Sequence, residues 1–209
     1  MSNISNTTSP LNFEEAKKRL SKVVNRTPLQ LNHNLSRRYQ AKVYLKREDL
    51  QIVRSYKLRG AYNMISTLPQ DKLQNGVTTA SAGNHAQGFA YSCKKLGIKG
   101  VVFMPVITPK QKISQTKMFG ANYIEIKLTG DTFDDCAIAA KRYTEENGMA
   151  FIPPFEDYKI IEGQGTVAVE ILDELSNIDY VFVPIGGGGL CSGVGSYFKV
   201  LIKTIQLCN

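Results

Sequence analysis

Apolar and polar residues follow two alternating patterns along this chain, one typical of helices and one typical of strands. Residues 13–24 place apolar side chains at helical spacing, whereas residues 42–49 alternate apolar and polar side chains as a strand does. Further helices are predicted over 57–68, 84–96, 132–147 and 160–175, with one that begins after Pro109 and a last one that begins near Gly189. Further strands are predicted over 76–80, 100–105, 121–128, 149–153 and 180–185. Strands that alternate with helices predict an α/β fold in which helices flank parallel sheets.

The composition is that of a globular protein. Of the 209 residues, 43% are hydrophobic and 21% are charged. No apolar stretch approaches the roughly 20 residues that a membrane span needs, and the polar N-terminus lacks the apolar core of a signal peptide. The four cysteines are too scattered for a CxxC pair, and there are only two histidines, so no metal site is expected. A cytoplasmic location with no membrane partner is therefore predicted.

The positive charge is concentrated near the N-terminus. Residues 1–60 carry 13 lysines and arginines against 4 acidic residues, whereas residues 61–209 carry 13 against 14. A basic segment is one feature of nucleic-acid-binding proteins, but here the basic residues are interleaved with apolar ones and accompany no nucleic-acid motif. A solvated surface that attracts a small anion is the favoured interpretation, and no nucleic-acid partner is expected.

Four consecutive glycines, residues 186–189, follow the predicted strand 180–185 and precede the last helix. Glycine lets a backbone approach a ligand closely, and the free amides at a helix N-terminus suit a phosphate. The loop lacks the Lys-Ser/Thr of a nucleoside-triphosphate loop and the spacing of a dinucleotide motif. It therefore indicates the phosphate of a smaller cofactor, with a flexible strand-to-helix turn as the alternative.

A second loop, SAGNH at residues 81–85, connects the strand 76–80 to the helix 84–96. Hydroxyl, amide and backbone N–H groups meet there at a helix start, which suits a carboxylate. Simple helix capping by Ser81 or Asn84 is the alternative. His85 by itself is compatible with a structural role as well as a functional one.

Lys57, in SYKLRG, lies where an apolar helix is predicted to begin, beside the aromatic Tyr56. An amine that loses hydration has a lowered pKa and becomes a nucleophile, although a lone lysine is usually a surface residue. A nucleophilic lysine, a phosphate loop and a carboxylate loop on one α/β fold are together what a pyridoxal-phosphate enzyme needs to hold an amino acid.

SYKLRGA, SAGNHAQG and GGGGL, in this order and spacing, resemble the threonine ammonia-lyase (L-threonine dehydratase, biosynthetic type) branch of the fold-type II pyridoxal-phosphate-dependent enzymes. KVYLKREDLQ, FMPVITPKQK, LTGDTFDD and IIEGQGTVAVEIL are also similar to that family, so the resemblance covers about residues 13–200. It implies a tryptophan-synthase-beta-like fold with a larger lobe, residues 1–52 and 153–209, and a smaller lobe, residues 53–152. It also implies pyridoxal 5'-phosphate as the cofactor.

The resemblance also assigns roles to residues. Lys57 is expected to form the Schiff base with the cofactor, with Tyr56 beside it in place of the phenylalanine of many relatives, and Asn84 to contact the ring hydroxyl. The phosphate loop is expected to consist of Gly186, Gly187, Gly188, Gly189 and Leu190. The substrate carboxylate is expected to be held by Ser81, Gly83, Asn84 and His85.

The implied reaction is the deamination of L-threonine to 2-oxobutanoate and ammonia, the first step of isoleucine biosynthesis. Lys57 is expected to act as the general base that removes the α-proton, while the cofactor ring accepts the carbanion charge. The three motifs do not separate threonine from serine, so a serine ammonia-lyase is an alternative.

The chain ends at YFKVLIKTIQLCN, whereas members of the family continue with further strands and, in biosynthetic members, a regulatory domain. We therefore expect a fold that is incomplete at its C-terminus, with no regulatory domain and with a sheet that stops after the strand 180–185 and one helix. Activity of this chain alone is expected to be impaired. A non-catalytic remnant that binds the cofactor or a partner is the alternative, and the complete protein is expected to form a homo-oligomer.

Overall fold

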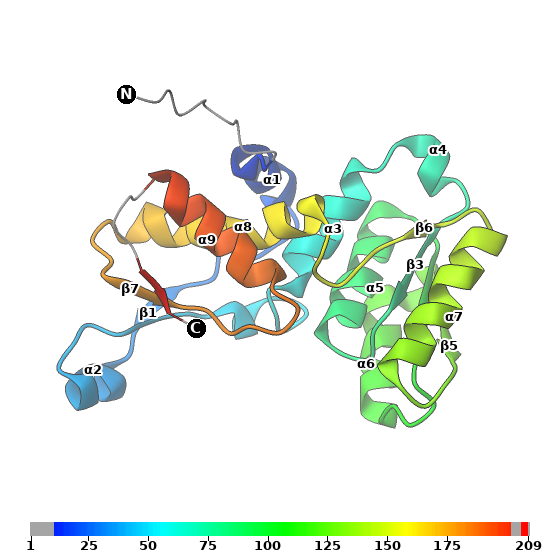
Figure 1. Cartoon of the computed structure of the whole chain (residues 1–209), viewed down its shortest axis with the longest axis horizontal. Coiled ribbons are helices and arrows are strands. Elements are labelled where there is room, and N and C mark those ends of the chain that lie inside the picture. Colours follow the sequence, from blue (N-terminus) through cyan, green and yellow to red (C-terminus); the bar gives the residue numbers. More distant parts are fainter. Residues whose placement is uncertain (1–10, 202–205, 209) are drawn as a thin grey trace, which may run out of the picture.

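The computed structural model describes residues 11–201 and 206–208, which form two groups of elements side by side (Figure 1). One group is a sheet with helices on both of its faces. The other group is mainly helical and contains the helices α1, α8 and α9, with α3 lying between the two groups.

The helices and strands alternate for most of the chain. The helices are α1 (Phe13–Leu20), α2 (His33–Tyr39), α3 (Lys57–Thr67), α4 (Gln70–Leu73), α5 (Asn84–Leu96), α6 (Lys110–Gly120), α7 (Phe133–Glu146), α8 (Tyr158–Glu174) and α9 (Gly189–Leu201). The strands are β1 (Leu29–Leu31), β2 (Tyr44–Lys46), β3 (Val77–Ala80), β4 (Gly100–Met104), β5 (Ile124–Leu128), β6 (Ala150–Phe151), β7 (Tyr180–Phe182) and β8 (Gln206–Cys208). Short 3-10 helices cover Glu48–Leu50 and Ala121–Tyr123.

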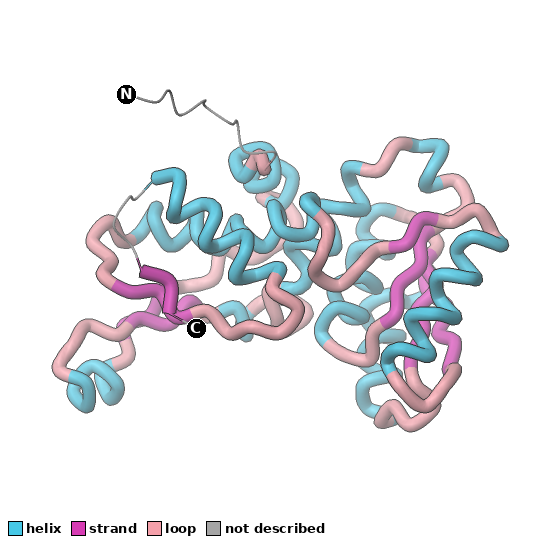
Figure 2. Tube along the Cα trace, in the orientation of Figure 1, coloured by secondary structure: helices cyan, strands magenta, loops and turns pink. Residues whose placement is uncertain are grey.

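The main sheet has four parallel strands in the order β5-β4-β3-β6 (Figure 2). Every residue of β3 and β4 is buried, because helices cover both faces. On one face Val102 packs in a cluster with Phe89 of α5, and on the other Phe103 packs with Cys136 of α7. This arrangement confirms the predicted α/β fold with a parallel sheet flanked by helices.

Helix α8 lies against α3 and α9 at very close range, and glycines make this possible. A Cβ added to Gly163 would lie 2.6 Å from the carbonyl oxygen of Arg59 in α3. A Cβ added to Gly193 of α9 would lie 2.4 Å from the carbonyl oxygen of Ile161 in α8. The glycines of IIEGQGTV in α8 therefore bring the backbones of the two neighbouring helices together.

A buried group of charges attaches the first turn of α3 to α8. The guanidinium of Arg59, which is 0% exposed, donates to both carboxylate oxygens of Glu48 (both 2.8 Å) and of Glu170 (2.7 and 2.9 Å). Lys46 lies 2.6 Å from Glu170, which makes the group electrically balanced. Burial acts to lower the pKa of Arg59, but the hydrogen bonds and charges of Glu48 and Glu170 outweigh it and raise that pKa.

Several local features differ from the sequence prediction, which also contained neither α2 nor α4. Of the strand predicted over 42–49 only β2 forms, and it pairs antiparallel with β1, which had not been predicted. The predicted strand 180–185 ends at Phe182. The expectation that the sheet stops after this strand and one helix was wrong, because β8 pairs in parallel with β7. Strands of three residues are too short to show a hydrophobic period, so only pairing reveals them.

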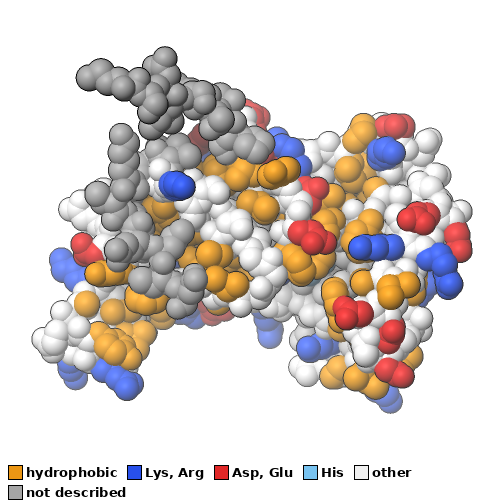
Figure 3. All heavy atoms as spheres, in the orientation of Figure 1, with side chains coloured by type: hydrophobic (Ala, Val, Ile, Leu, Met, Phe, Trp, Pro, Cys, Tyr) orange, Lys and Arg blue, Asp and Glu red, His pale blue; other side chains and the backbone are white. Residues whose placement is uncertain are grey.

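The surface is not uniform in character. On the face shown in Figure 3, acidic and basic side chains gather over the part that carries α7, whereas hydrophobic side chains are prominent over the α8–α9 part. In β7, Tyr180 is 59% exposed and Phe182 is 77% exposed.

Candidate functional site

Lys57 is the first residue of α3, and its side chain is half-buried. Its amine donates a 2.7 Å hydrogen bond to the carbonyl oxygen of Pro154 and lies 5.6 Å from the ring centre of Tyr56 and 5.9 Å from that of Phe155. Burial lowers the pKa of Lys57, because an ammonium loses hydration there. This lysine therefore differs from a solvated surface lysine in the way that nucleophilic chemistry requires.

The loop 81–85 leads into α5 without a side-chain cap. Gly83 is the N-cap residue, and the Ser81 hydroxyl accepts a hydrogen bond from the Gly83 amide (3.2 Å) rather than from an amide inside the helix. Asn84 is exposed, and its side chain makes no hydrogen bond with the described part of the chain. The first-turn N–H groups of α5 therefore have no capping side chain, which speaks against the simple capping alternative and leaves them for an anion.

His85 is buried behind this loop. One ring nitrogen, Nε2, lies 3.2 Å from the carbonyl oxygen of Ile152, and the other, Nδ1, is buried without a hydrogen-bond partner in the described chain. Burial, and secondarily the positive charge of Lys57, lower the pKa of His85 to about 3. His85 is therefore neutral at pH 7, with Nε2 as the donor to Ile152.

The glycine loop presents two different sides. A Cβ on Gly187 would lie 2.2 Å from ring atoms of Phe155, and one on Gly189 would lie 2.7 Å from the Phe155 carbonyl oxygen. A Cβ added to Gly186 or Gly188 would have no atom within 4 Å. The backbone φ of Gly188 is 85°, a value that residues other than glycine rarely adopt. One side of the loop is thus closed by Phe155, while the other is open and can admit a ligand.

The structure brings the three predicted motifs together. The charge of Lys57 acts on His85, so the first and second motifs are neighbours. Tyr56 packs against the same hydrophobic cluster as Leu190, so the first and third motifs are also neighbours. One site could therefore hold three groups at once: an electrophile at Lys57, an anion at the start of α5 and a phosphate at the glycine loop.

Residues 152–155 were missed by the sequence prediction, although they connect all three motifs. The carbonyl of Ile152 faces His85, the carbonyl of Pro154 faces Lys57, and Phe155 lies against the glycine loop. The only available signal was position: the segment follows the carboxyl end of β6, and ligands of parallel sheets bind at that end.

The donor set and the open space fit a phosphorylated, planar carbonyl compound. The open side at Gly186 and Gly188 offers room for a phosphate, and the start of α9 at Gly189 offers amides. The half-buried amine of Lys57 can react with an aldehyde, and the nearby rings of Tyr56 and Phe155 can pack on a flat ring.

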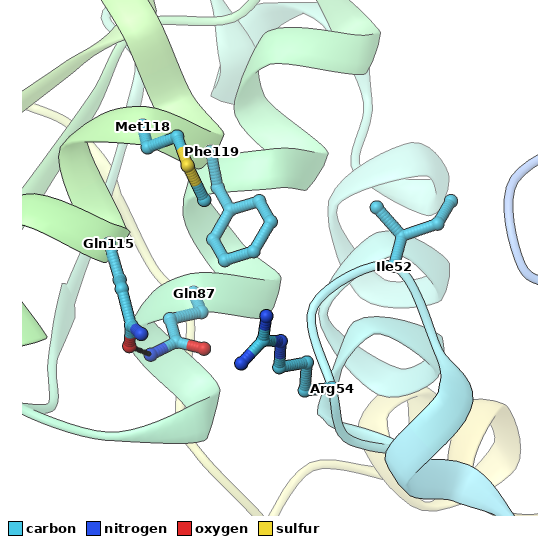
Figure 4. A pocket seen from close by; sticks show the side chains of 6 residues that line it. All are labelled: Ile52, Arg54, Gln87, Gln115, Met118 and Phe119. Atoms are coloured by element: carbon cyan, nitrogen blue, oxygen red, sulfur yellow. Dashed lines mark hydrogen bonds between the residues drawn. The ribbon is translucent and has the colours of Figure 1, made fainter.

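The structure also contains a separate pocket of about 150 Å³. It is lined by Ile52, Arg54, Gln87, Gln115, Met118 and Phe119 (Figure 4). In it, the Gln87 amide donates to the Gln115 side-chain oxygen (3.1 Å), and the Arg54 guanidinium points toward the two amides. None of the residues predicted to hold the cofactor or the substrate lines this pocket.

No helix within residues 11–201 is long and apolar enough to cross a membrane. In the same described part of the chain, no three His, Cys, Asp or Glu side chains are grouped so that they could hold a metal ion.

Comparison with curated proteins gives close relatives. The chain is 53% identical over 208 residues to "L-threonine dehydratase biosynthetic IlvA" of Staphylococcus aureus (strain NCTC 8325 / PS 47), which covers 98% of this chain and 49% of that protein. It is 56% identical over 200 residues to the protein of the same name in Staphylococcus saprophyticus, covering 94% of this chain and 47% of that protein. The chain thus spans about half the length of the curated relatives that it matches.

Solved structures agree with this likeness. The processed form of threonine deaminase isoform 2 from Solanum lycopersicum superposes with a TM-score of 0.85 at 41% identity, over 94% of this chain and 55% of that one. Maize serine racemase superposes with a TM-score of 0.89 at 33% identity, over 93% of this chain and 58% of that one. A family model described as "Pyridoxal-phosphate dependent enzyme" matches residues 20–208. Because this match extends over most of the 209 residues, the chain belongs to the family of pyridoxal-phosphate-dependent enzymes.

Proposed function

We propose that the protein to which this chain belongs deaminates L-threonine to 2-oxobutanoate and ammonia, as a threonine ammonia-lyase. The observation that carries the proposal is the half-buried amine of Lys57, which is hydrogen-bonded to the segment 152–155 that also contacts His85 and the glycine loop. The names of the bacterial relatives support threonine as the substrate.

Lys57 is the residue that would hold pyridoxal phosphate covalently. Its lowered pKa increases the fraction of free amine near neutral pH, which speeds its reaction with an aldehyde. With a substrate in the site, the same amine would serve as the general base that takes the proton from the substrate Cα. When bound, pyridoxal phosphate supplies a ring that accepts the charge left on that carbon.

The glycine loop would hold the phosphate. Its open side, at Gly186 and Gly188, faces away from Phe155, and Leu190 follows in the first turn of α9. Gly187 and Gly189 must remain glycines because Phe155 occupies the space that their side chains would need.

The start of α5 would hold the substrate carboxylate through backbone amides. His85 contributes as a neutral residue whose ring holds the loop to Ile152, since its pKa of about 3 excludes a positive charge at pH 7. Ser81 holds the Gly83 amide, and the exposed Asn84 side chain is free to contact the cofactor's ring hydroxyl.

A second candidate is a remnant that binds the cofactor without catalysis. It is supported by the exposed Tyr180 and Phe182 of β7, which leave an apolar surface for a partner. The same exposed surface supports association, and we propose that the complete protein is a cytoplasmic homo-oligomer that binds no nucleic acid.

The test is complementation. The 209-residue chain would be co-expressed with the portion of the S. aureus relative that follows the matched region, and the complex assayed for 2-oxobutanoate from threonine and pyruvate from serine. Threonine turnover that requires both pieces and Lys57 would support the proposal. Cofactor binding without turnover of either amino acid would favour the remnant, and a preference for serine would favour a serine ammonia-lyase.

A further inference from the structure

The segment of residues 152–155 crosses from β6 to α8 and contacts every part of the candidate site. The Ile152 carbonyl accepts hydrogen bonds from Thr79 at the end of β3 (2.8 Å) and from His85 (3.2 Å). Two residues later, the Pro154 carbonyl accepts the hydrogen bond of Lys57 (2.7 Å). The backbone of this segment therefore holds two of the three motifs.

Phe155 extends these contacts to the third motif. Its ring lies under Gly187, where an added Cβ would approach ring atoms to 2.2 Å, and its carbonyl oxygen lies under Gly189. The centre of the same ring is 5.9 Å from the Lys57 amine. One side chain thus lies near the amine and also packs against the glycine loop, on the side away from the phosphate space.

We propose that Phe155 is a positioning residue of the cofactor site, one that sets the distance between the Lys57 amine and the glycine loop and keeps water from the amine. The inference rests on the proposed function, because it assigns to these two groups the two ends of one cofactor.

The requirement is geometric. Pyridoxal phosphate is a rigid ring that would be attached at its aldehyde to Lys57 and at its phosphate to the loop, so the two attachment points must match a fixed length. A packed side chain that holds both in place avoids an ordering cost on binding. The ring also removes water from one side of the amine, and desolvation is the cause of the lowered pKa of Lys57.

An attraction between the ammonium and the aromatic ring would act in the opposite direction. At 5.9 Å from the ring centre the amine lies at the outer limit of about 6 Å for such contacts. The desolvating effect therefore exceeds the attraction, and removal of the ring should raise the pKa of Lys57 toward its usual 10.5.

The test uses the 209-residue chain with four substitutions. Phe155→Ala removes the ring, Phe155→Leu keeps apolar bulk in case the alanine variant does not fold, and Phe155→Tyr keeps the ring. Phe151→Ala is the matched control, because Phe151 ends β6 directly before this segment but packs against the cluster of Cys136 and Ala140 from α7.

The first measurement is the pH profile of Lys57 acetylation by trace acetic anhydride without cofactor, followed by peptide mass spectrometry. We expect Phe155→Ala to shift the profile upward, which slows labelling at pH 8 about tenfold for each unit of pKa. Phe155→Leu should show a smaller shift, and Phe155→Tyr and Phe151→Ala should match the wild-type profile.

The second measurement compares affinities for pyridoxal phosphate and for pyridoxamine phosphate, which has no aldehyde. Phe155→Ala should raise the dissociation constant of pyridoxal phosphate by about tenfold or more, because binding of this compound depends on both ends of the site. The dissociation constant of pyridoxamine phosphate should rise by less. A wild-type labelling profile in Phe155→Ala, or equal effects in Phe151→Ala, would overturn the inference. Failure of the wild-type chain to attach the cofactor at Lys57 would instead count against the proposed function, and the labelling profile would still decide the role of Phe155.

Discussion

The amine of Lys57 donates a hydrogen bond of 2.7 Å to the backbone carbonyl of Pro154, which lies 97 residues further along the chain. The contact joins the first turn of α3 to the segment that leaves β6. Because the acceptor is a backbone oxygen, it depends on the path of the chain at residue 154 and not on the identity of a side chain. The position of the amine is thus tied to the path of the segment between β6 and α8.

Substitution of Lys57 should remove covalent attachment of the cofactor. In Lys57→Ala the visible absorption of bound pyridoxal phosphate should be lost, and borohydride reduction followed by peptide mapping should find no modified lysine in the site. Lys199→Ala, which removes an exposed amine on α9, should retain both signals. Modification of another lysine in the wild-type chain would show that Lys57 has been assigned the wrong role.

Negative charge on the glycine loop should weaken cofactor binding. Gly187→Asp would add such a charge, but its Cβ would meet Phe155 at 2.2 Å, so a steric effect would accompany the charge. Gly186→Asp is the cleaner test, because the space around Gly186 is open, and Gly186→Asn is its neutral match.

We expect Gly186→Asp to raise the dissociation constant of pyridoxal phosphate at least tenfold over that of Gly186→Asn, which corresponds to about 1.4 kcal/mol. Lys199→Ala should leave it unchanged. Equal affinities of the aspartate and asparagine variants in a fluorescence titration would rule out a phosphate at this loop.

Stability should fall in mild acid because of His85. Its pKa is about 3 in the folded chain and 6.5 when unperturbed, so the unfolded chain binds more protons between these values. The stabilising contribution of the neutral ring is complete above about pH 6.5 and is lost as the pH falls toward 3.

Between pH 7 and pH 5 this group alone should reduce the free energy of unfolding by about 2 kcal/mol. His85→Gln, which keeps a donor for the Ile152 carbonyl, should lose correspondingly less over the same range in urea titrations. Identical pH dependence of the two proteins would mean that His85 ionises freely in the folded state.

Loss of the Arg59 guanidinium should destabilise the fold strongly. Arg59→Met leaves the carboxylates of Glu48 and Glu170 buried with only Lys46 to balance them, and breaking such a buried group costs about 3–5 kcal/mol. Arg47→Met removes an exposed pair with Asp49, which solvent screens, and should change the urea midpoint little. Similar urea midpoints for the two variants would show that the buried group is not needed to hold α3 on α8.

The 209-residue chain alone should form little or no 2-oxobutanoate from threonine. Tyr180, Phe182 and Ile185 are exposed by half or more, as is typical of a surface that lacks a covering element, and Gly186 and Gly187 are open to solvent. Water at the site weakens its electrostatic contacts and the activation of Lys57. Saturable turnover by a well-folded monomer loaded with pyridoxal phosphate would contradict this expectation.

The sequence by itself determined the order and type of most elements between Lys57 and Leu201, because buried strands and amphipathic helices leave clear hydrophobic periods. It also indicated Lys57, the loop 81–85 and the glycines 186–189 as candidate site residues. Each is a residue type or short run whose local setting favours a particular chemistry. The boundaries proposed for two lobes remain predictions, as do the roles of the individual site residues.

Only the tertiary structure decided how these motifs meet. Ile152, Pro154 and Phe155 contribute two backbone carbonyls and one ring, and nothing in a local pattern marks a carbonyl as the acceptor for a lysine 97 residues away. The neutral state of His85 and the buried partners of Arg59 likewise depend on burial and on distant charges. Local composition fixes what a segment can form, whereas desolvation and long-range contacts exist only once the chain has packed.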